Sequence, residues 1–125
     1  MTTGVPHPFP TPSRTTIVER AEQLLRNRAA EPLPIAHLSA LVGVSERGLR
    51  NAFRAVRGMS PKRYVIQNRL IDVRRALCEP RRRRATVTDI ATEYGFFELG
   101  RFAARYKAAF GETPSTTLRT NGHAE

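Results

Sequence analysis

The sequence predicts an all-α fold of about seven helices, in which two helix-turn-helix subdomains are joined by a long linker helix. Three observations lead to this prediction. Apolar residues recur at helical spacing along most of the chain. Segments 35–61 and 87–114 match each other position by position. Between them, residues 60–77 carry a continuous apolar stripe, which indicates one uninterrupted helix.

The N-terminal part of the chain changes character near Thr16. Residues 1–14 contain four prolines and no apolar periodicity, so we expect a disordered leader or linker. Thr16 and Glu19 have the spacing of a capping box, which predicts that a first helix begins there. Its buried face should consist of Ile17, Val18, Ala21, Leu24 and Leu25.

The first helix-turn-helix subdomain is expected over residues 15–59. A short helix from Ile35 should end at Gly43, a residue able to adopt the left-handed conformation found after many helices. Ser45 is the candidate N-cap of the next helix, whose inner face is Leu49, Ala52, Phe53 and Val56. Two short helices joined by such a turn make a helix-turn-helix, although plain helical hairpins share the pattern.

The linker helix over residues 60–77 has a recognisable start, because Ser60 can cap it and Pro61 suits its first position. At about 1.5 Å per residue, a helix of this length would span about 27 Å. The arginine run 81–84 follows as a loop. Such a run either contacts nucleic acid or is a solvated loop without a partner.

The second subdomain is expected over residues 78–119. Thr86 and Asp89 form another capping box, after which two short helices are separated by a glycine turn. A last short helix is predicted near residues 114–119, and residues 120–125 are expected to be a disordered tail.

The two matching segments indicate a tandem duplication. One residue inserted in the second turn changes the offset from 52 to 53, and the matched pairs are Ile35–Val87, Leu38–Ile90, Val42–Tyr94, Gly43–Gly95, Leu49–Phe102, Phe53–Tyr106, Gly58–Gly111 and Pro61–Pro114. Helices that read one face of DNA from successive major grooves lie about 34 Å apart. A direct repeat on a stiff spacer therefore predicts an asymmetric, non-palindromic DNA site.

The charge of the chain favours an anionic polymer as partner. The 125 residues include 21 Lys and Arg against 11 Asp and Glu, a formal net charge of +10. Most of the excess lies in residues 60–85, whereas residues 86–119 are balanced. No membrane span, signal peptide, multi-cysteine zinc site or catalytic constellation is recognisable. We expect a cytoplasmic, nucleoid-associated protein that is not an enzyme and has no cofactor, metal or small-molecule site.

Two stretches resemble the DNA-binding domain of AraC/XylS-type transcriptional regulators: GVSERGLRNAFRAVRGMSPKRYVIQNRL and DIATEYGFFELGRFAARYKAAFGETPSTTLR. The resemblance covers about residues 15–119, and the second stretch is the more specific. It implies an all-α domain that binds double-stranded DNA as a sequence-specific regulator, usually behind an N-terminal sensing or dimerisation domain. The chain is then either a fragment of a larger regulator or a short stand-alone member.

By this resemblance, the base-reading positions of the family fall on Arg47, Arg50 and Asn51. Their chemistry agrees, because arginine can bond guanine O6 and N7 and asparagine can bond adenine N6 and N7. A solvated polar face is the alternative interpretation. Arg101 is the candidate reader on the second recognition helix. Contacts to the DNA backbone are expected from Ser45, Arg54, Arg63, Arg84, Thr86 and Arg105.

The second recognition helix offers fewer polar readers. Its outward positions are Leu99, Gly100, Arg101, Ala104 and Arg105. Ala104 departs from the long polar side chain that family members often carry there. Gly100 could permit a close approach of the backbone to DNA, or it could simply pack. We hypothesise that the first motif specifies the sequence while the second anchors the protein through its arginines and helix starts.

One function from another class remains as an alternative. The chain could be a protein-interaction module that contacts RNA polymerase or a partner regulator and binds DNA only weakly. Buried helix faces, rather than a cofactor site, explain the spacing of Ile35, Leu38, Leu49, Phe53, Ile90, Phe96, Phe102, Tyr106 and Phe110.

Overall fold

The computed structural model describes residues 12–28, 34–82 and 84–121. Within these ranges the regular structure is entirely helical, as predicted, and no β-strand occurs. The elements are α1 (Arg14–Arg26), α2 (Ile35–Val42), α3 (Glu46–Arg57), α4 (Pro61–Leu77), the short 3-10 helix η1 (Pro80–Arg82), α5 (Val87–Glu93), α6 (Leu99–Phe110) and α7 (Pro114–Asn121). Of the stretches predicted to be disordered, 1–14 and 120–125, residues 1–11 and 122–125 fall outside the described residues. The prediction was wrong at Arg14, which begins α1, and at Thr120 and Asn121, which end α7, because the buried Asn121 Nδ2 donates a hydrogen bond to the Glu79 carbonyl at 2.7 Å.

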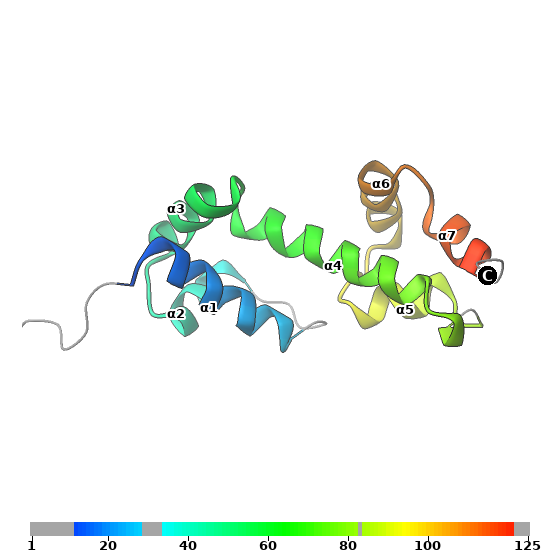
Figure 1. Ribbon diagram of the computed structural model, residues 1–125, viewed down its shortest axis with the longest axis horizontal. Helices are drawn as coiled ribbons and strands as arrows, with labels where there is room; N and C mark the ends of the chain where they lie inside the picture. The colour runs from blue at the N-terminus through cyan, green and yellow to red at the C-terminus, as the bar shows by residue number, and fades with distance from the viewer. Residues whose placement is uncertain (1–11, 29–33, 83, 122–125) are drawn as a thin grey trace, which may run out of the picture.

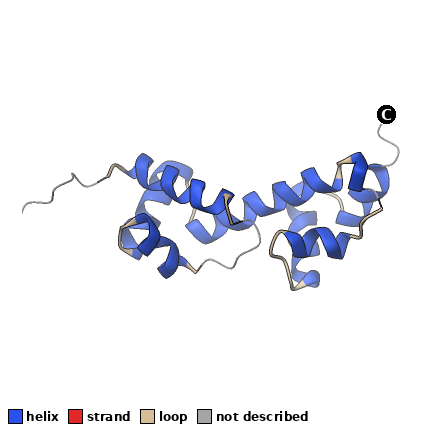
Figure 2. Ribbon diagram, turned by 90° about the horizontal axis from the view of Figure 1, so that it is seen from below, coloured by secondary structure: helices blue, strands red, loops and turns tan. Residues whose placement is uncertain are grey.

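The molecule is elongated, with a group of helices at each end of α4 (Figure 1). Helices α1, α2 and α3 lie around the N-terminal end of α4, and α5, α6 and α7 lie around its C-terminal half. The view from below shows the same two groups, joined by the long helix (Figure 2). No helix in the described part of the chain is long and apolar enough to cross a membrane.

The first helical group has its own apolar core. Its buried residues come from α1, α2 and α3, and Tyr64 near the start of α4 packs against them. The rings of Phe53 and Tyr64 lie 5.2 Å apart between centroids. The buried members are Ile17, Val18, Ala21, Leu38, Val42, Leu49, Ala52 and Phe53. All core residues predicted for this half belong to the cluster, although Leu24, Leu25, Ile35 and Val56 are only partly buried.

The second group has a separate core in which α4 is a full partner. Leu70, Val73, Ala76 and Leu77 of α4 pack with Ile90 and Ala91 of α5 and with three aromatic residues, Phe96, Phe102 and Tyr106. Phe110 packs against this cluster and is only partly buried. Helix α4 is therefore more than the stiff spacer that the sequence suggested, because its C-terminal half supplies a wall of the second core.

The helix starts follow the predicted caps with one exception. Ser45 and Ser60 accept backbone hydrogen bonds from the residues three positions later, at 2.9 and 3.2 Å. The first helix, however, begins at Arg14 and is capped by Ser13, whose Oγ accepts a hydrogen bond from the Thr16 N–H. The predicted capping box at Thr16 was wrong because Ser13 offers an equivalent hydroxyl one turn earlier.

Four glycines confirm the internal repeat. The positive-φ glycines of the described residues are Gly43 (87°), Gly58 (71°), Gly95 (90°) and Gly111 (77°), and they form two of the pairs matched by sequence. Gly43, Gly58 and Gly111 are the C-caps of α2, α3 and α6, and Gly95 directly follows the C-cap of α5, Tyr94. Left-handed backbone favours glycine, so both copies share the same backbone course at these positions.

The structure extends the repeat beyond the segments matched by sequence. With the same offset of 52, Val18 and Ala21 of α1 correspond to Leu70 and Val73 of α4, and all four are buried. Helix α4 thus begins as the closing helix of the first unit and continues as the opening helix of the second. Sharing one helix couples the orientation of the two units.

Candidate nucleic-acid interface

Helix α3 presents a polar face opposite its buried one. Ser45 caps the helix, and Leu49, Ala52 and Phe53 anchor it in the first core. This packing leaves Arg47, Asn51 and Arg54 exposed. Arg50 is also exposed, and its Nη1 lies 3.6 Å from Glu46 Oε1 one turn away. Such an exposed pair contributes little stability, so DNA could compete for Arg50 at small cost.

Helix α6 exposes fewer polar side chains at the corresponding positions than α3 does. Arg101 is exposed, and its Nη1 lies 3.1 Å from Glu98 Oε1 just before the helix. Arg105 is half-buried, and Ala104 is exposed. A Cβ atom built at Gly100 would meet no other atom within 4 Å. Gly100 therefore does not serve close packing within the protein, and the close approach of its backbone to DNA stays a prediction.

Two grooves meet along the first turns of α4. The first, about 550 Å³, lies between α4 and α6 and is lined by Ser60, Lys62, Arg63, Ile66, Gln67, Leu70, Arg105, Ala108 and Ala109. The second, about 660 Å³, lies between α2, α3 and α4 and is lined by Pro34, Ile35, Leu38, Arg50, Ser60, Pro61, Lys62, Val65 and Ile66. Ser60, Lys62 and Ile66 belong to both.

These grooves bring together residues that are far apart in the sequence. Arg63 and Arg105, both predicted to contact the DNA backbone, line the same groove. Arg50, a predicted base reader, borders the adjacent groove. Lys62 lines both grooves and was missed by the sequence analysis, although the adjacent Lys62–Arg63 pair behind a helix cap was a visible signal. The result is a cationic strip between the two recognition helices.

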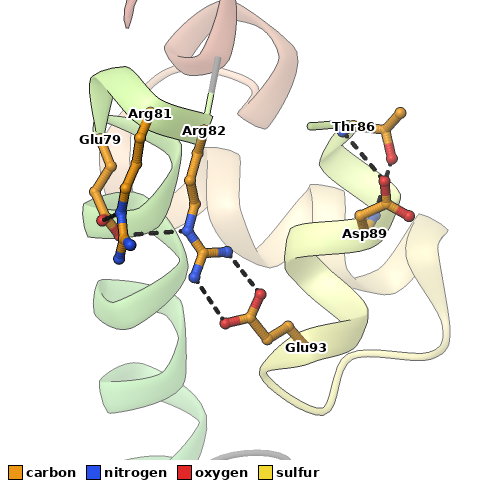
Figure 3. A network of polar contacts seen from close by, with 6 residues as sticks. All are labelled: Glu79, Arg81, Arg82, Thr86, Asp89 and Glu93. Carbon is orange, nitrogen blue, oxygen red and sulfur yellow. Dashed lines mark hydrogen bonds and ion pairs between the residues drawn. The ribbon is translucent and has the colours of Figure 1, made fainter. Parts of the chain in front are cut away.

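The arginines of the run 81–84 differ in the contacts that they make within the protein (Figure 3). Arg82 makes a bidentate pair with Glu93 of α5, at 2.6 and 3.0 Å, and its Nε lies 3.5 Å from Glu79. The hydrogen bond with Glu93 raises the pKa of Arg82 further and holds the pKa of Glu93 below its ordinary value. Arg81 pairs with Glu79 at 2.8 Å. Arg84 is exposed, and Arg83 lies outside the described residues.

The N-terminus of α5 carries the predicted capping box, formed by Thr86 and Asp89 (Figure 3). Thr86 Oγ1 accepts a hydrogen bond from the Asp89 N–H at 3.0 Å, and the Thr86 N–H donates to Asp89 Oδ2 at 3.4 Å. A phosphate at Thr86 would have to approach the Asp89 carboxylate. This geometry weighs against Thr86, whereas the residue in the corresponding position of α3 is Gly48, which places no carboxylate beside the Ser45 hydroxyl.

A polar cluster ties α3 to the two helices beside it. Glu22 of α1 accepts hydrogen bonds from Arg57 Nε, at 2.9 Å, and from the Tyr64 hydroxyl. The Glu22 side chain is only 11% exposed. Its contacts raise the pKa of Arg57, and burial followed by the bond to Glu22 raises the pKa of Tyr64. The cluster fixes the end of α3 against α1 and α4, so it orients the recognition helix.

The described part of the chain contains no recognisable cluster of metal ligands. No group of three His, Cys, Asp or Glu side chains there is arranged to hold a metal ion. Cys78, at the C-terminal end of α4, is an exposed free thiol. The charged residues that line the grooves between α3 and α6 are all cationic, which suits contacts with phosphates.

Comparison with known proteins agrees with this geometry. A helix-turn-helix domain family matches residues 38–120. The XylDLEGF operon transcriptional activator of Pseudomonas putida is 39% identical over 101 residues, which cover 81% of this chain and 32% of that protein. The chain thus spans about a third of the length of this relative. The alternative of a protein-interaction module with weak DNA binding is not favoured by these matches.

Two solved structures resemble the chain over nearly their whole length. A probable AraC family transcriptional regulator from Rhodopseudomonas palustris CGA009 is 36% identical, has a TM-score of 0.76, and is matched over 84% of this chain and 96% of its own. An AraC-type transcriptional regulator from Chromobacterium violaceum, 24% identical with a TM-score of 0.79, shares the fold over 89% of this chain and 96% of its own.

Proposed function

The chain belongs to the AraC/XylS type of helix-turn-helix transcriptional regulators, and from this we propose that it recognises an asymmetric DNA site through both of its motifs. In this proposal, subdomains 15–59 and 78–119 place α3 and α6 in successive major grooves. The linker over residues 60–77 holds them about one turn of B-form DNA, or about 34 Å, apart.

The observation that carries the proposal is the arrangement of cations around the first turns of α4. Arg50 of α3 and Arg105 of α6 border adjacent grooves that share Lys62. A DNA strand passing from one recognition helix to the other would cross this strip. Phosphate contacts of this kind set register and orientation, while base contacts carry the sequence information.

The two motifs have unequal roles in this proposal. Arg47, Arg50 and Asn51 read bases from α3, where they are exposed and held on a well-anchored helix. Arg101 contributes less to base preference, because the neighbouring outward positions of α6, Gly100 and Ala104, offer no polar side chain beside it. Contacts to the DNA backbone come from Ser45, Arg54, Arg63, Arg84 and Arg105. Lys62 joins this set because it lines both grooves. Thr86 is its weakest member, because the Asp89 carboxylate lies beside it.

Partners beyond DNA belong to the same proposal. RNA polymerase is proposed as a second partner, in line with the activator role named for the relative from Pseudomonas putida. The protein is proposed to act in the cytoplasm at the nucleoid and to have no enzymatic activity of its own.

An unbiased selection of DNA sequences by the purified chain tests the proposal. We expect a direct, non-palindromic pair of half-sites, bound about 10³-fold or more tightly than random DNA. In repeated selections, Arg47→Ala should relax the base preference of one half-site, and Arg101→Ala should weaken binding with little change in preference. Equal affinity for selected and random DNA would contradict sequence-specific recognition, and a larger loss of preference from Arg101→Ala would contradict the unequal roles.

A further inference from the structure

Two large apolar side chains are exposed at the start of α6. Phe97, just before the helix, is 66% exposed, and Leu99, its first residue, is 38% exposed. The other exposed large apolar residues in the described part of the chain, Leu41 and Ile71, lie singly on α2 and α4. Isolated exposed apolar residues need no explanation, whereas a pair beside a recognition helix does.

The internal repeat shows what α6 has in place of the readers of α3. With the offset of 53, Arg47 corresponds to Gly100, Arg50 to Ala103 and Asn51 to Ala104. Gly100, Ala103 and Ala104 are all exposed. Where α3 offers hydrogen-bond donors, α6 offers methyl groups and bare backbone, continuous with Leu99.

Two arginines border this apolar strip. Arg101 and Arg105 lie one turn apart along one edge of it. The combination suits the major groove, whose walls are phosphates and whose floor carries the C5 methyl group of every thymine. Apolar side chains such as alanine and phenylalanine contact that methyl group, which cytosine lacks. Because Gly100 has no side chain, the helix backbone at this position can come close to the base edges.

We propose that α6 reads its half-site through thymine methyl groups, with Leu99 as the main contact, Ala103 and Ala104 beside it, and Phe97 covering the edge of the contact. This inference rests on the proposed function and adds the chemistry of the second half-site. It revises the expectation that α6 only anchors the protein: the helix discriminates bases by shape and apolar contact rather than by hydrogen bonds.

Replacement of thymine by uracil tests the proposal, because it removes the C5 methyl group and keeps the hydrogen-bonding edge. Each thymine of the selected site is replaced in turn, and affinities are measured by fluorescence anisotropy with the full chain. We expect at least one position in the half-site under α6 to lose about fourfold in affinity. Leu99→Ala should remove most of that sensitivity, so that the variant binds thymine and uracil sites almost equally.

Matched variants distinguish a direct contact between Leu99 and thymine from a general loss of DNA affinity. Leu41→Ala removes a similarly exposed leucine far from α6 and should leave the thymine-to-uracil ratio unchanged. Wild-type protein that binds all uracil-substituted sites as tightly as the parent site would overturn the inference. Full uracil sensitivity retained in Leu99→Ala and in Phe97→Ala would overturn it as well. Either result leaves specific DNA binding intact, whereas failure of the proposed function would appear as loss of specificity for the parent site.

Discussion

Gly100 occupies on α6 the position that Arg47 occupies on α3, 53 residues earlier in the chain. One position therefore carries a long cation in the first motif and no side chain in the second. Because a Cβ at Gly100 would meet nothing within 4 Å beyond the adjoining backbone of its own helix, the glycine costs backbone entropy without any packing benefit. The two copies share one backbone course and have diverged on the surface that we propose faces DNA.

Gly100→Ala should stabilise the protein and weaken its binding to DNA. Replacing a helical glycine by alanine in open space gains about 0.5 kcal/mol in the free energy of unfolding. The added methyl group would stand between the backbone and the base edges. Urea unfolding and anisotropy titrations measure the two effects. Gly48→Ala on α3 is the contrast, because its Cβ would lie 3.2 Å from the capping Ser45 Oγ and should bring no gain. Unchanged DNA affinity in Gly100→Ala would contradict the close approach.

The arginines of run 81–84 should separate into structural and DNA-contacting members. Arg82→Ala loses the bidentate pair with Glu93, so we expect it to lower the free energy of unfolding by about 1 kcal/mol with little change in the salt dependence of binding. Arg84→Ala should leave stability unchanged and reduce the slope of log K against log salt by about 0.9. Titrations at several salt concentrations provide the measurement. A reduced slope in Arg82→Ala would show that the pair opens to bind phosphate.

Glu22→Gln should destabilise the first unit more than any exposed ion pair does. The substitution leaves Arg57 without its carboxylate and weakens the acceptor of the Tyr64 hydroxyl, at a side chain that is itself only 11% exposed. We expect a loss of about 1–3 kcal/mol in the free energy of unfolding. Glu46→Gln, which breaks the exposed pair with Arg50, is the matched control and should cost less than about 0.5 kcal/mol. Similar losses in both variants would mean that the Glu22 cluster is not a structural anchor.

Acid should weaken the contact between η1 and α5. The hydrogen bond from Arg82 holds the pKa of Glu93 below its ordinary value. The stability that this carboxylate contributes is therefore fully present above about pH 4.3 and is lost as the pH falls through the lowered pKa. Urea unfolding at pH 7, 5, 4 and 3 should show a smaller acid-induced loss in Glu93→Gln than in the wild type. Identical pH profiles would show that the pair does not persist in solution.

Much of the fold followed from the sequence because its signals are local. The periodicity of apolar residues, the caps at Ser45 and Ser60, and the left-handed glycines each act within one or two turns. The start of α1 was misplaced because Ser13 and Thr16 offer similar hydroxyls one turn apart. The local sequence alone does not show which of the two residues caps α1.

The two helix-turn-helix motifs, their relation as a repeat and the polar face of α3 could all be predicted from the sequence, because apolar periodicity, caps and residue chemistry are local properties of the chain. Only the tertiary structure decided which charges are available to a partner. Arg57 and Arg82 are held by Glu22 and Glu93, whereas Arg63 and Arg105 share an open groove. Pairing between charges depends on distances between helices, and those distances are set by the packing of α4 into both cores.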